Sequence, residues 1–319
     1  MPNNIWVEKY RPTDLSDICA QDKIINSLEN VKNANNMPHL LFFGPSGCGK
    51  TSTILALSKK IFGSSYKERI IEMNASDERG IKVIREKIKN YAKQSVNTIK
   101  GIPPWKIIIL DEADTMTQDS QFALRRIMEE YSHITRFCII CNYINKIIDP
   151  IISRCSSFKF NSINNNILLE KLNLICSKEN IKTSDDNLKL IIKLCRGDLR
   201  KSINYLQNCN DLYNNVSKSS INDISGIIPD NIIYDLIESC KKYKNFDDQI
   251  DKIYNEGYSL VNQISPIIEI ISKDKDLNSS QKSKIVSIII DVEQNLLRGC
   301  DEYILYYKLF YYIACLLNV

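Results

Sequence analysis

The stretch that most constrains this chain is Gly44-Pro45-Ser46-Gly47-Cys48-Gly49-Lys50-Thr51, a glycine-rich turn that ends in Lys and Thr. An apolar run at 40–43, typical of a buried strand, precedes it, and apolar residues at helical spacing follow from Ser52 to Ile61. A strand, a loop of small residues and a helix, in that order, let backbone N–H groups surround phosphates at the positive end of the helix. The pattern predicts a phosphate-binding loop.

Two side chains of this loop are expected to act directly on a nucleotide. Lys50 would reach the β- and γ-phosphate oxygens, and the Thr51 hydroxyl would ligate Mg²⁺. A glycine-rich turn with a chance Lys-Thr is the alternative. A matching acidic motif further along the chain argues against it.

That motif is Ile107-Ile108-Ile109-Leu110-Asp111-Glu112-Ala113-Asp114. Four apolar residues that end in carboxylates describe a central parallel strand whose carboxyl end carries charge, which is where open α/β sheets bind ligands. Asp111 would hold Mg²⁺ through its water shell, and Glu112 would orient the attacking water. Alone, the motif could be a strand that meets a solvated turn. Together with the phosphate loop, it predicts an enzyme that hydrolyses a nucleoside triphosphate.

Composition and cysteine spacing give no support for a zinc-binding, secreted or membrane-spanning protein. The 319 residues suffice for two or three domains, and a formal charge of +4 is too small to establish a nucleic-acid partner. The only close cysteine pair, Cys138 and Cys141, lacks the second pair that a zinc site needs. The polar start predicts no secretory leader and reduced thiols. The most apolar stretch, 303–317, is short and contains Lys308, so no membrane span is expected.

Strand and helix patterns alternate up to residue 161 and predict a doubly wound α/β domain with a largely parallel sheet. Further strands are expected at 70–73, 136–141 and 158–160. Residues 162–228 are expected to form a small domain of three helices, at 167–177, 188–195 and 199–209. Residues 229–319 carry long apolar stripes at helical spacing and predict an all-helical domain for packing within or between chains.

Two features leave alternatives open at this point. On the helix expected at 81–92, Lys82, Arg85 and Lys89 form a basic stripe, which is either a solvated face or a surface that follows DNA phosphates. Asn142 ends a strand expected next to the acidic one. It either contacts the γ-phosphate or the attacking water, or simply caps its strand.

With these pieces in order, the chain resembles the small subunits of replication factor C, the sliding-clamp loader of the AAA+ class. The resemblance runs over nearly the whole length. It implies an AAA+ nucleotide-binding domain (1–161), a helical lid (162–228) and a helical collar for oligomerisation (229–319). The motifs that carry it are Val7-Glu8-Lys9-Tyr10-Arg11-Pro12, Asn74-Ala75-Ser76-Asp77-Glu78-Arg79-Gly80, Leu110-Asp111-Glu112-Ala113-Asp114, Ser153-Arg154-Cys155 and Gly197-Asp198-Leu199-Arg200.

Within the family, segments 51–56, 84–90 and 135–143 are most similar to the subgroup numbered four in animals and two in budding yeast. A sister subgroup shares much of these segments.

The resemblance implies roles that spacing alone does not. Asn142 would be the first sensor of the γ-phosphate, and Arg200 the second, reaching from the lid. Arg154 would be an arginine finger that works in trans on ATP bound by the neighbouring subunit. Asn74 matches a polar switch residue that holds the catalytic glutamate away from water until DNA binds.

The resemblance also implies two contact surfaces. An N-terminal arm would lie against the adenine, through Val7, Tyr10, Arg11 and Pro12. The basic stripe would line the inside of a subunit spiral and follow the DNA backbone, through Lys82, Arg85 and Arg79.

The phosphate loop departs from the usual family pattern twice, because Ser46 stands where Pro is common and Cys48 where Thr is common. The loop binds phosphate through backbone N–H groups, so ATP binding should survive. Cys48 places a thiol beside Lys50, and we expect its oxidation or alkylation to block nucleotide binding.

The resemblance implies an ATPase subunit of a nuclear hetero-pentamer. With ATP and Mg²⁺, it would open the ring-shaped clamp, proliferating cell nuclear antigen (PCNA), and load it on primer–template DNA. One alternative is a subunit of the same complex that binds nucleotide only as a scaffold. Another is a different AAA+ DNA machine, such as a replication initiator or branch-migration helicase. No winged-helix pattern with its strand hairpin is visible after residue 229, which argues against this alternative, whereas direct DNA binding by the isolated tail would favour it.

Overall fold

The computed structural model describes residues 5–33, 37–75, 81–96 and 101–318, with backbone alone described at 31–33 and 81–85. The chain forms two compact units, Met1–Asn210 and Asp211–Val319. Each unit is described by itself below.

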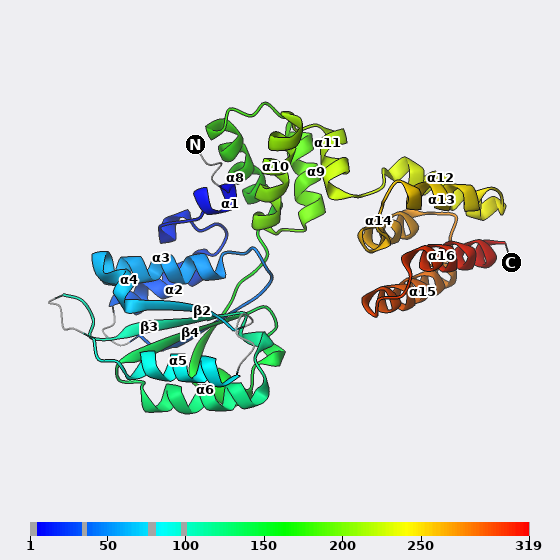
Figure 1. The fold of residues 1–319 in the computed structure, drawn as a ribbon. Coiled ribbons are helices and arrows are strands. Elements are labelled where there is room, and N and C mark those ends of the chain that lie inside the picture. Colours follow the sequence, from blue (N-terminus) through cyan, green and yellow to red (C-terminus); the bar gives the residue numbers. More distant parts are fainter. Residues whose placement is uncertain (1–4, 34–36, 76–80, 97–100, 319) are drawn as a thin grey trace. The chain divides into compact units, whose positions relative to one another are not determined.

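Unit 1 is built on a parallel sheet whose strands lie in the order β2-β3-β4-β1-β5 (Figure 1). All carboxyl ends therefore lie at one edge, where β1, β3 and β4 are neighbours. This confirms the predicted doubly wound sheet. The strands are β1 (His39–Phe43), β2 (Ile70–Asn74), β3 (Lys106–Asp111), β4 (Thr135–Cys141) and β5 (Cys155–Lys159).

Successive side chains of β3 pack on opposite faces of the sheet, as the pleat of a strand requires. Ile107 and Ile109 join the core under α2 and α3, whereas Ile108 and Leu110 join the core under α5 and α6. Helices thus cover both faces (Figure 1), which explains why the strand is apolar at consecutive positions.

The helices of unit 1 follow the apolar periodicities of the sequence. The helices are α1 (Trp6–Lys9), α2 (Asp22–Asn33), α3 (Lys50–Phe62), α4 (Tyr66–Arg69), α5 (Ile81–Lys93), α6 (Gln118–Glu130), α7 (Asp149–Ile152), α8 (Asn165–Lys178), α9 (Asp185–Cys195) and α10 (Leu199–Tyr213), which begins in unit 1 and ends just past its boundary at Asn210. Short 3-10 helices lie at Leu15–Asp17, Gly63–Ser65, Ala113–Thr115 and Ile144–Lys146.

The last strand differs from the expected span 158–160. It begins at Cys155 and ends at Lys159, and Phe160 follows it as a fully buried residue. The backbone N–H of Phe160 still donates to the carbonyl of Phe43 at 2.8 Å. The apolar side chains of Phe158 and Phe160 therefore indicated contact with the core. The ends of the strand instead depend on where β5 pairs with β1, from Cys155 to Lys159.

Three of the helices in the predicted lid range 162–228 correspond to the predicted ones: α8, α9 and α10. The sequence analysis missed a fourth helix in this range, at Lys218–Ser225, whose first turn is capped by the Ser217 side chain. The side chains of Asn164 and Ser184 cap the first turns of α8 and α9. These caps satisfy N–H groups that the first turn leaves without partners, which is why both helices begin a few residues before their apolar stripes.

Unit 2 is built of helices joined by short loops, and its described residues contain no strand. A single apolar core joins its helices α12 to α16 and includes Ile237, Ile267, Ile289 and Phe310. No helix of the described chain is both long and apolar enough to cross a membrane. The helices are α11 (Lys218–Ser225), α12 (Asp230–Lys242), α13 (Phe246–Asn255), α14 (Leu260–Lys273), α15 (Ser279–Leu297) and α16 (Glu302–Leu317).

Candidate active site

β1 delivers the phosphate loop to the carboxyl edge of the sheet. Gly44 has φ +146°, and a Cβ built on it would lie 2.2 Å from the carbonyl oxygen of Phe160. Only glycine fits this approach between the loop and the chain after β5. The loop then turns directly into α3, which begins at Lys50.

The ammonium of Lys50 is folded into the loop and only 8% of the residue is exposed. Its Nζ donates to the carbonyl oxygens of Gly44 and Pro45 at 2.8 and 2.7 Å, and to Asn142 Oδ1 at 2.9 Å. These oxygens match the three donors of an ammonium group. The loop lysine and the residue at the end of β4, predicted independently, thus meet at one point.

The two residues expected to hold a metal also meet. Thr51 Oγ1 donates to Asp111 Oδ2 at 2.7 Å, and Asp111 Oδ1 accepts from the backbone N–H of Glu112 at 2.9 Å. A hydroxyl and a carboxylate are hard oxygen ligands, which suit Mg²⁺ completed by water and phosphate oxygens. The described residues contain no cluster of three or more His, Cys, Asp or Glu that could bind a metal by themselves.

Glu112 occupies an unusual backbone conformation for a residue other than glycine, with φ +53°. Left-handed conformations of this kind are costly and cluster at functional sites. Asn74, at the end of β2, pairs in register with Asp111, and the next residue, Ala75, donates its N–H to the Asp111 carbonyl at 2.9 Å. The predicted switch residue therefore lies on the strand next to the acidic motif.

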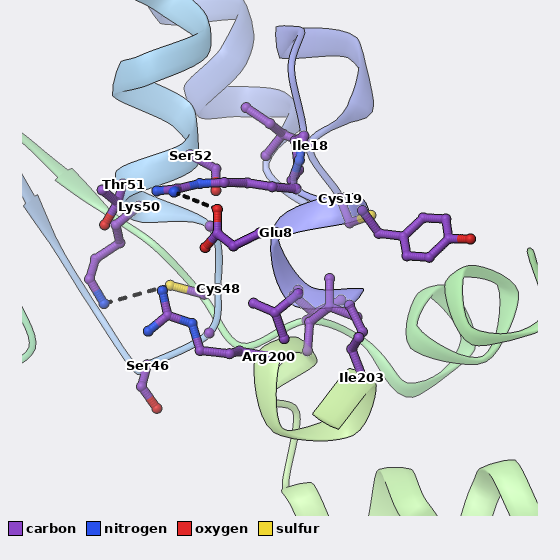
Figure 2. A pocket seen from close by; sticks show the side chains of 18 of the residues that line it. Glu8, Ile18, Cys19, Ser46, Cys48, Lys50, Thr51, Ser52, Arg200 and Ile203 are labelled. Atoms are coloured by element: carbon purple, nitrogen blue, oxygen red, sulfur yellow. Dashed lines mark hydrogen bonds and ion pairs between the residues drawn. The ribbon is translucent and has the colours of Figure 1, made fainter. Parts of the chain in front are cut away.

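One pocket gathers residues from the N-terminal arm, the phosphate loop, the acidic motif and the lid (Figure 2). In this view Arg200 extends from the lid toward the side of the pocket that holds Lys50 and Cys48. The predicted residues that line the pocket are Val7, Tyr10, Arg11, Pro12, Ser46, Gly47, Cys48, Gly49, Lys50, Thr51, Ser52, Asp111, Glu112, Asn142 and Arg200.

Other predicted residues lie elsewhere. Arg154 does not line the pocket. Its guanidinium pairs with Glu129 at 2.5 Å and donates to the carbonyl of Pro150 at 2.7 Å. Gly44, Pro45 and Asn74 do not line the pocket either. Of the predicted DNA contacts, Arg79 and the side chains of Lys82 and Arg85 lie outside the described residues.

The sequence analysis missed part of the lining. Leu199 and Ile203 flank the predicted Arg200 on α10, and Ile203 could have been found because it lies three residues further, on the same helix face. Glu8 lies within the arm motif, beside the predicted Val7. No local signal marked Ile18, Cys19 and Ile163, because long-range packing brings them to the pocket. The missed lining residues are Glu8, Ile18, Cys19, Ile163, Leu199 and Ile203.

The lid also touches the phosphate loop at a position that we did not expect. Ser46 Oγ donates to Asp198 Oδ2 at 2.8 Å, although the two residues lie 152 positions apart. A Cβ on Gly47 would lie 1.9 Å from the other carboxylate oxygen of Asp198. The Asp198 carboxylate therefore packs directly against the loop backbone at Gly47.

Cys48 is almost fully buried, and its Sγ donates to the Pro45 carbonyl at 2.9 Å. Burial raises the pKa of this thiol, and the positive charge of Lys50 offsets only part of the effect. Burial likewise raises the pKa of Cys141 to about 12. Because the reactive form is the thiolate, these pKa directions argue against an unusually reactive Cys48.

Comparisons with known proteins agree with this site. Residues 40–162 match the ATPase family associated with various cellular activities (AAA), 170–210 the RCF1/5-like AAA+ ATPase lid domain, and 228–310 the replication factor C C-terminal domain. Replication factor C subunit 2 of Schizosaccharomyces pombe is 42% identical, with 93% of this chain and 90% of that protein covered. Replication factor C subunit 4 of Homo sapiens is 40% identical, with 94% and 85% covered.

This chain belongs to the replication factor C family. It is an AAA+ ATP hydrolase that binds nucleotide. The relatives numbered two and four support the predicted subgroup, and Replication factor C subunit 2 of Saccharomyces cerevisiae is also 40% identical, with 94% of this chain and 89% of that protein covered. The structure divides into compact units after Asn210, which is neither of the predicted domain boundaries. The boundaries at 161 and 228 therefore stay predictions.

Solved structures support the fold. The Thermotoga maritima RuvB Holliday junction branch migration motor aligns with a TM-score of 0.53 at 16% identity, over 72% of this chain and 78% of that one. At this identity the likeness concerns the AAA+ architecture alone. The described residues of unit 2 contain no strand, so they lack the winged-helix hairpin that would have favoured a different AAA+ DNA machine.

Proposed function

We propose that this chain is an ATP-hydrolysing subunit of a hetero-pentameric replication factor C clamp loader. The observation that carries the proposal is the single pocket in which the phosphate loop, the acidic motif, Asn142 and Arg200 converge, in a member of this family. A subunit that served only as scaffold would be expected to have lost part of this set.

Each residue of the pocket has a separate role in ATP hydrolysis. Lys50 leaves its three oxygen partners for the β- and γ-phosphates, and Asn142 and Arg200 contact the γ-phosphate. Thr51 and Asp111 would hold Mg²⁺, which would supply charge neutralisation at the phosphates. Glu112 orients the attacking water, and Asn74, on the neighbouring strand, restrains Glu112 until DNA binds.

The site is completed by a neighbouring subunit. Arg154 lies outside its own chain's pocket and would act on ATP held next door, while a neighbour's arginine serves this site. Hydrolysis is therefore slow in the isolated chain and faster in the complex.

The partners follow from the same family assignment. ATP binding assembles the spiral that opens PCNA in the nucleus, and primer–template DNA enters against Arg79, Lys82 and Arg85. Because these residues would contact phosphates, binding should fall steeply with salt and show little sequence preference.

The test is ATP hydrolysis by the reconstituted complex that carries Glu112→Gln in this subunit, with and without PCNA and primer–template DNA. We expect the variant to lose this site's share of the stimulated turnover while it still binds ATP and traps the clamp. Glu170→Gln, an exposed change on α8, is the matched control. If Glu112→Gln leaves turnover unchanged, the site binds nucleotide as a scaffold.

A further inference from the structure

The N-terminal arm, residues 5–12, is attached to two helices of the lid. Trp6 is buried, and its backbone N–H donates to Gln207 Oε1 of α10 at 2.9 Å. Lys9 and Tyr10 both donate to Glu179, the residue that follows the last turn of α8. Figure 1 shows α1 beside α8 and α10. These contacts join residues about 170 and 201 positions apart.

Glu179 accepts hydrogen bonds from two residues of the arm. One oxygen, Oε1, accepts from Lys9 Nζ at 2.5 Å and from the Tyr10 hydroxyl. The Nζ atoms of Lys9 and Lys178 lie 5.4 and 5.7 Å from the centre of the Tyr10 ring. Hydrogen bonds to an ionised acceptor are stronger than neutral ones, and ammonium groups over an aromatic ring add further attraction. The ring of Tyr10 is therefore held in one place.

The attached segment is also one wall of the nucleotide pocket. Tyr10 lines the pocket together with Arg11. On α10, Arg200, Ile203 and Gln207 follow at spacings of three and four and share one face of the helix. On that face, Arg200 and Ile203 line the pocket, and Gln207 accepts the hydrogen bond from the arm.

We propose that Glu179 and Gln207 are positioning residues that attach the arm, the wall of the pocket that would face the adenine, to the lid, so that this wall is in place when nucleotide binds. The inference rests on the proposed ATP site and concerns how that site is assembled. The apparent affinity for a ligand scales with the fraction of molecules in the conformation that binds it. A pocket whose wall is always in place therefore binds more tightly than one whose wall is ordered only part of the time.

The test compares Tyr10→Phe, Glu179→Gln and the double variant in the full chain, with ATP and inorganic tripolyphosphate as the two ligands in calorimetric titrations. Tyr10→Phe keeps the ring and removes only the hydroxyl. Each single variant should weaken ATP binding about three- to tenfold, the range expected when an attachment of one or two hydrogen bonds is lost. Affinity for tripolyphosphate, which has no base, should match wild type.

The double variant should bind ATP no more weakly than Glu179→Gln alone, because the Tyr10 hydroxyl acts only through its hydrogen bond to the Glu179 side chain. Glu170→Gln is the control on α8 and should bind both ligands as wild type does. Wild-type ATP affinity in both single variants would overturn the inference and leave the ATP site intact. An equal loss for tripolyphosphate would overturn it too, since that result means general damage. Wild-type protein that bound neither ligand would instead refute the proposed function.

Discussion

Cys48 shows how much the setting of a single residue changes its chemistry. In the sequence it stands two positions before Lys50, a spacing that indicates an activated thiol. In the structure it is 1% exposed, and burial raises its pKa. The raised pKa lowers the thiolate fraction at any pH below it. Solvent access, which no local pattern reveals, therefore decides the reactivity of Cys48.

We predict that alkylation at neutral pH reaches the exposed Cys300 and Cys315 well before Cys48. Peptide mass spectrometry after timed iodoacetamide treatment measures the order. Cys48→Thr should lose ATPase activity under this treatment no more slowly than wild type. Rapid labelling of Cys48 that bound nucleotide suppresses would contradict this prediction and restore the expectation of a sensitive thiol.

At the scale of elements, the start of α10 is joined to the phosphate loop by one buried carboxylate. Asp198 Oδ1 accepts from the backbone N–H of Lys201 at 3.0 Å and caps the helix, while Oδ2 accepts from Ser46. The helix that carries Arg200 is thereby held against the loop. The sequence predicted both elements, but not this contact, because Ser46 was expected only as a harmless departure from the family pattern.

Ser46→Ala should lower the free energy of unfolding of unit 1 by about 1–2 kcal/mol, since it leaves a buried carboxylate oxygen without its donor. Both tryptophans, Trp6 and Trp105, lie in unit 1, so tryptophan fluorescence during urea unfolding reports on this unit. Asp198→Asn keeps the shape of the cap and removes the charge.

In the double variant of Ser46 and Asp198, the losses should not add, because the two residues share one hydrogen bond. Ser177→Ala, an exposed serine of α8, is the control. Strictly additive losses would mean that Ser46 and Asp198 do not act through their contact.

At the scale of the whole molecule, the chain carries an arginine that its own nucleotide pocket does not use. Arg154 is held by Glu129, which also accepts from Arg125 at 3.1 Å. These hydrogen bonds and charges lower the pKa of the Glu129 carboxyl. An arginine presented at the surface by an ionised partner suits a site on another subunit.

We therefore predict that Arg154→Gln leaves the ATP affinity of the isolated chain unchanged, as measured by calorimetry. In the reconstituted complex it should slow hydrolysis at the site it completes by about 10³-fold or more, the range known for arginine fingers. Arg126→Gln, an exposed change on α6, is the control. Fast ATP turnover by a confirmed monomer of the wild-type chain would refute the action of Arg154 in trans.

The sequence by itself determined the phosphate loop, the acidic motif, the alternation of strands and helices, and the family. These features are local: glycine conformations, apolar runs and helical periodicity act over a few residues, so neighbouring residues suffice to specify them. Only the tertiary structure decided that Asp198 meets Ser46, that Glu179 holds Tyr10 and that Cys48 is buried. Such contacts join residues far apart in the chain, and many weak packing interactions position them together.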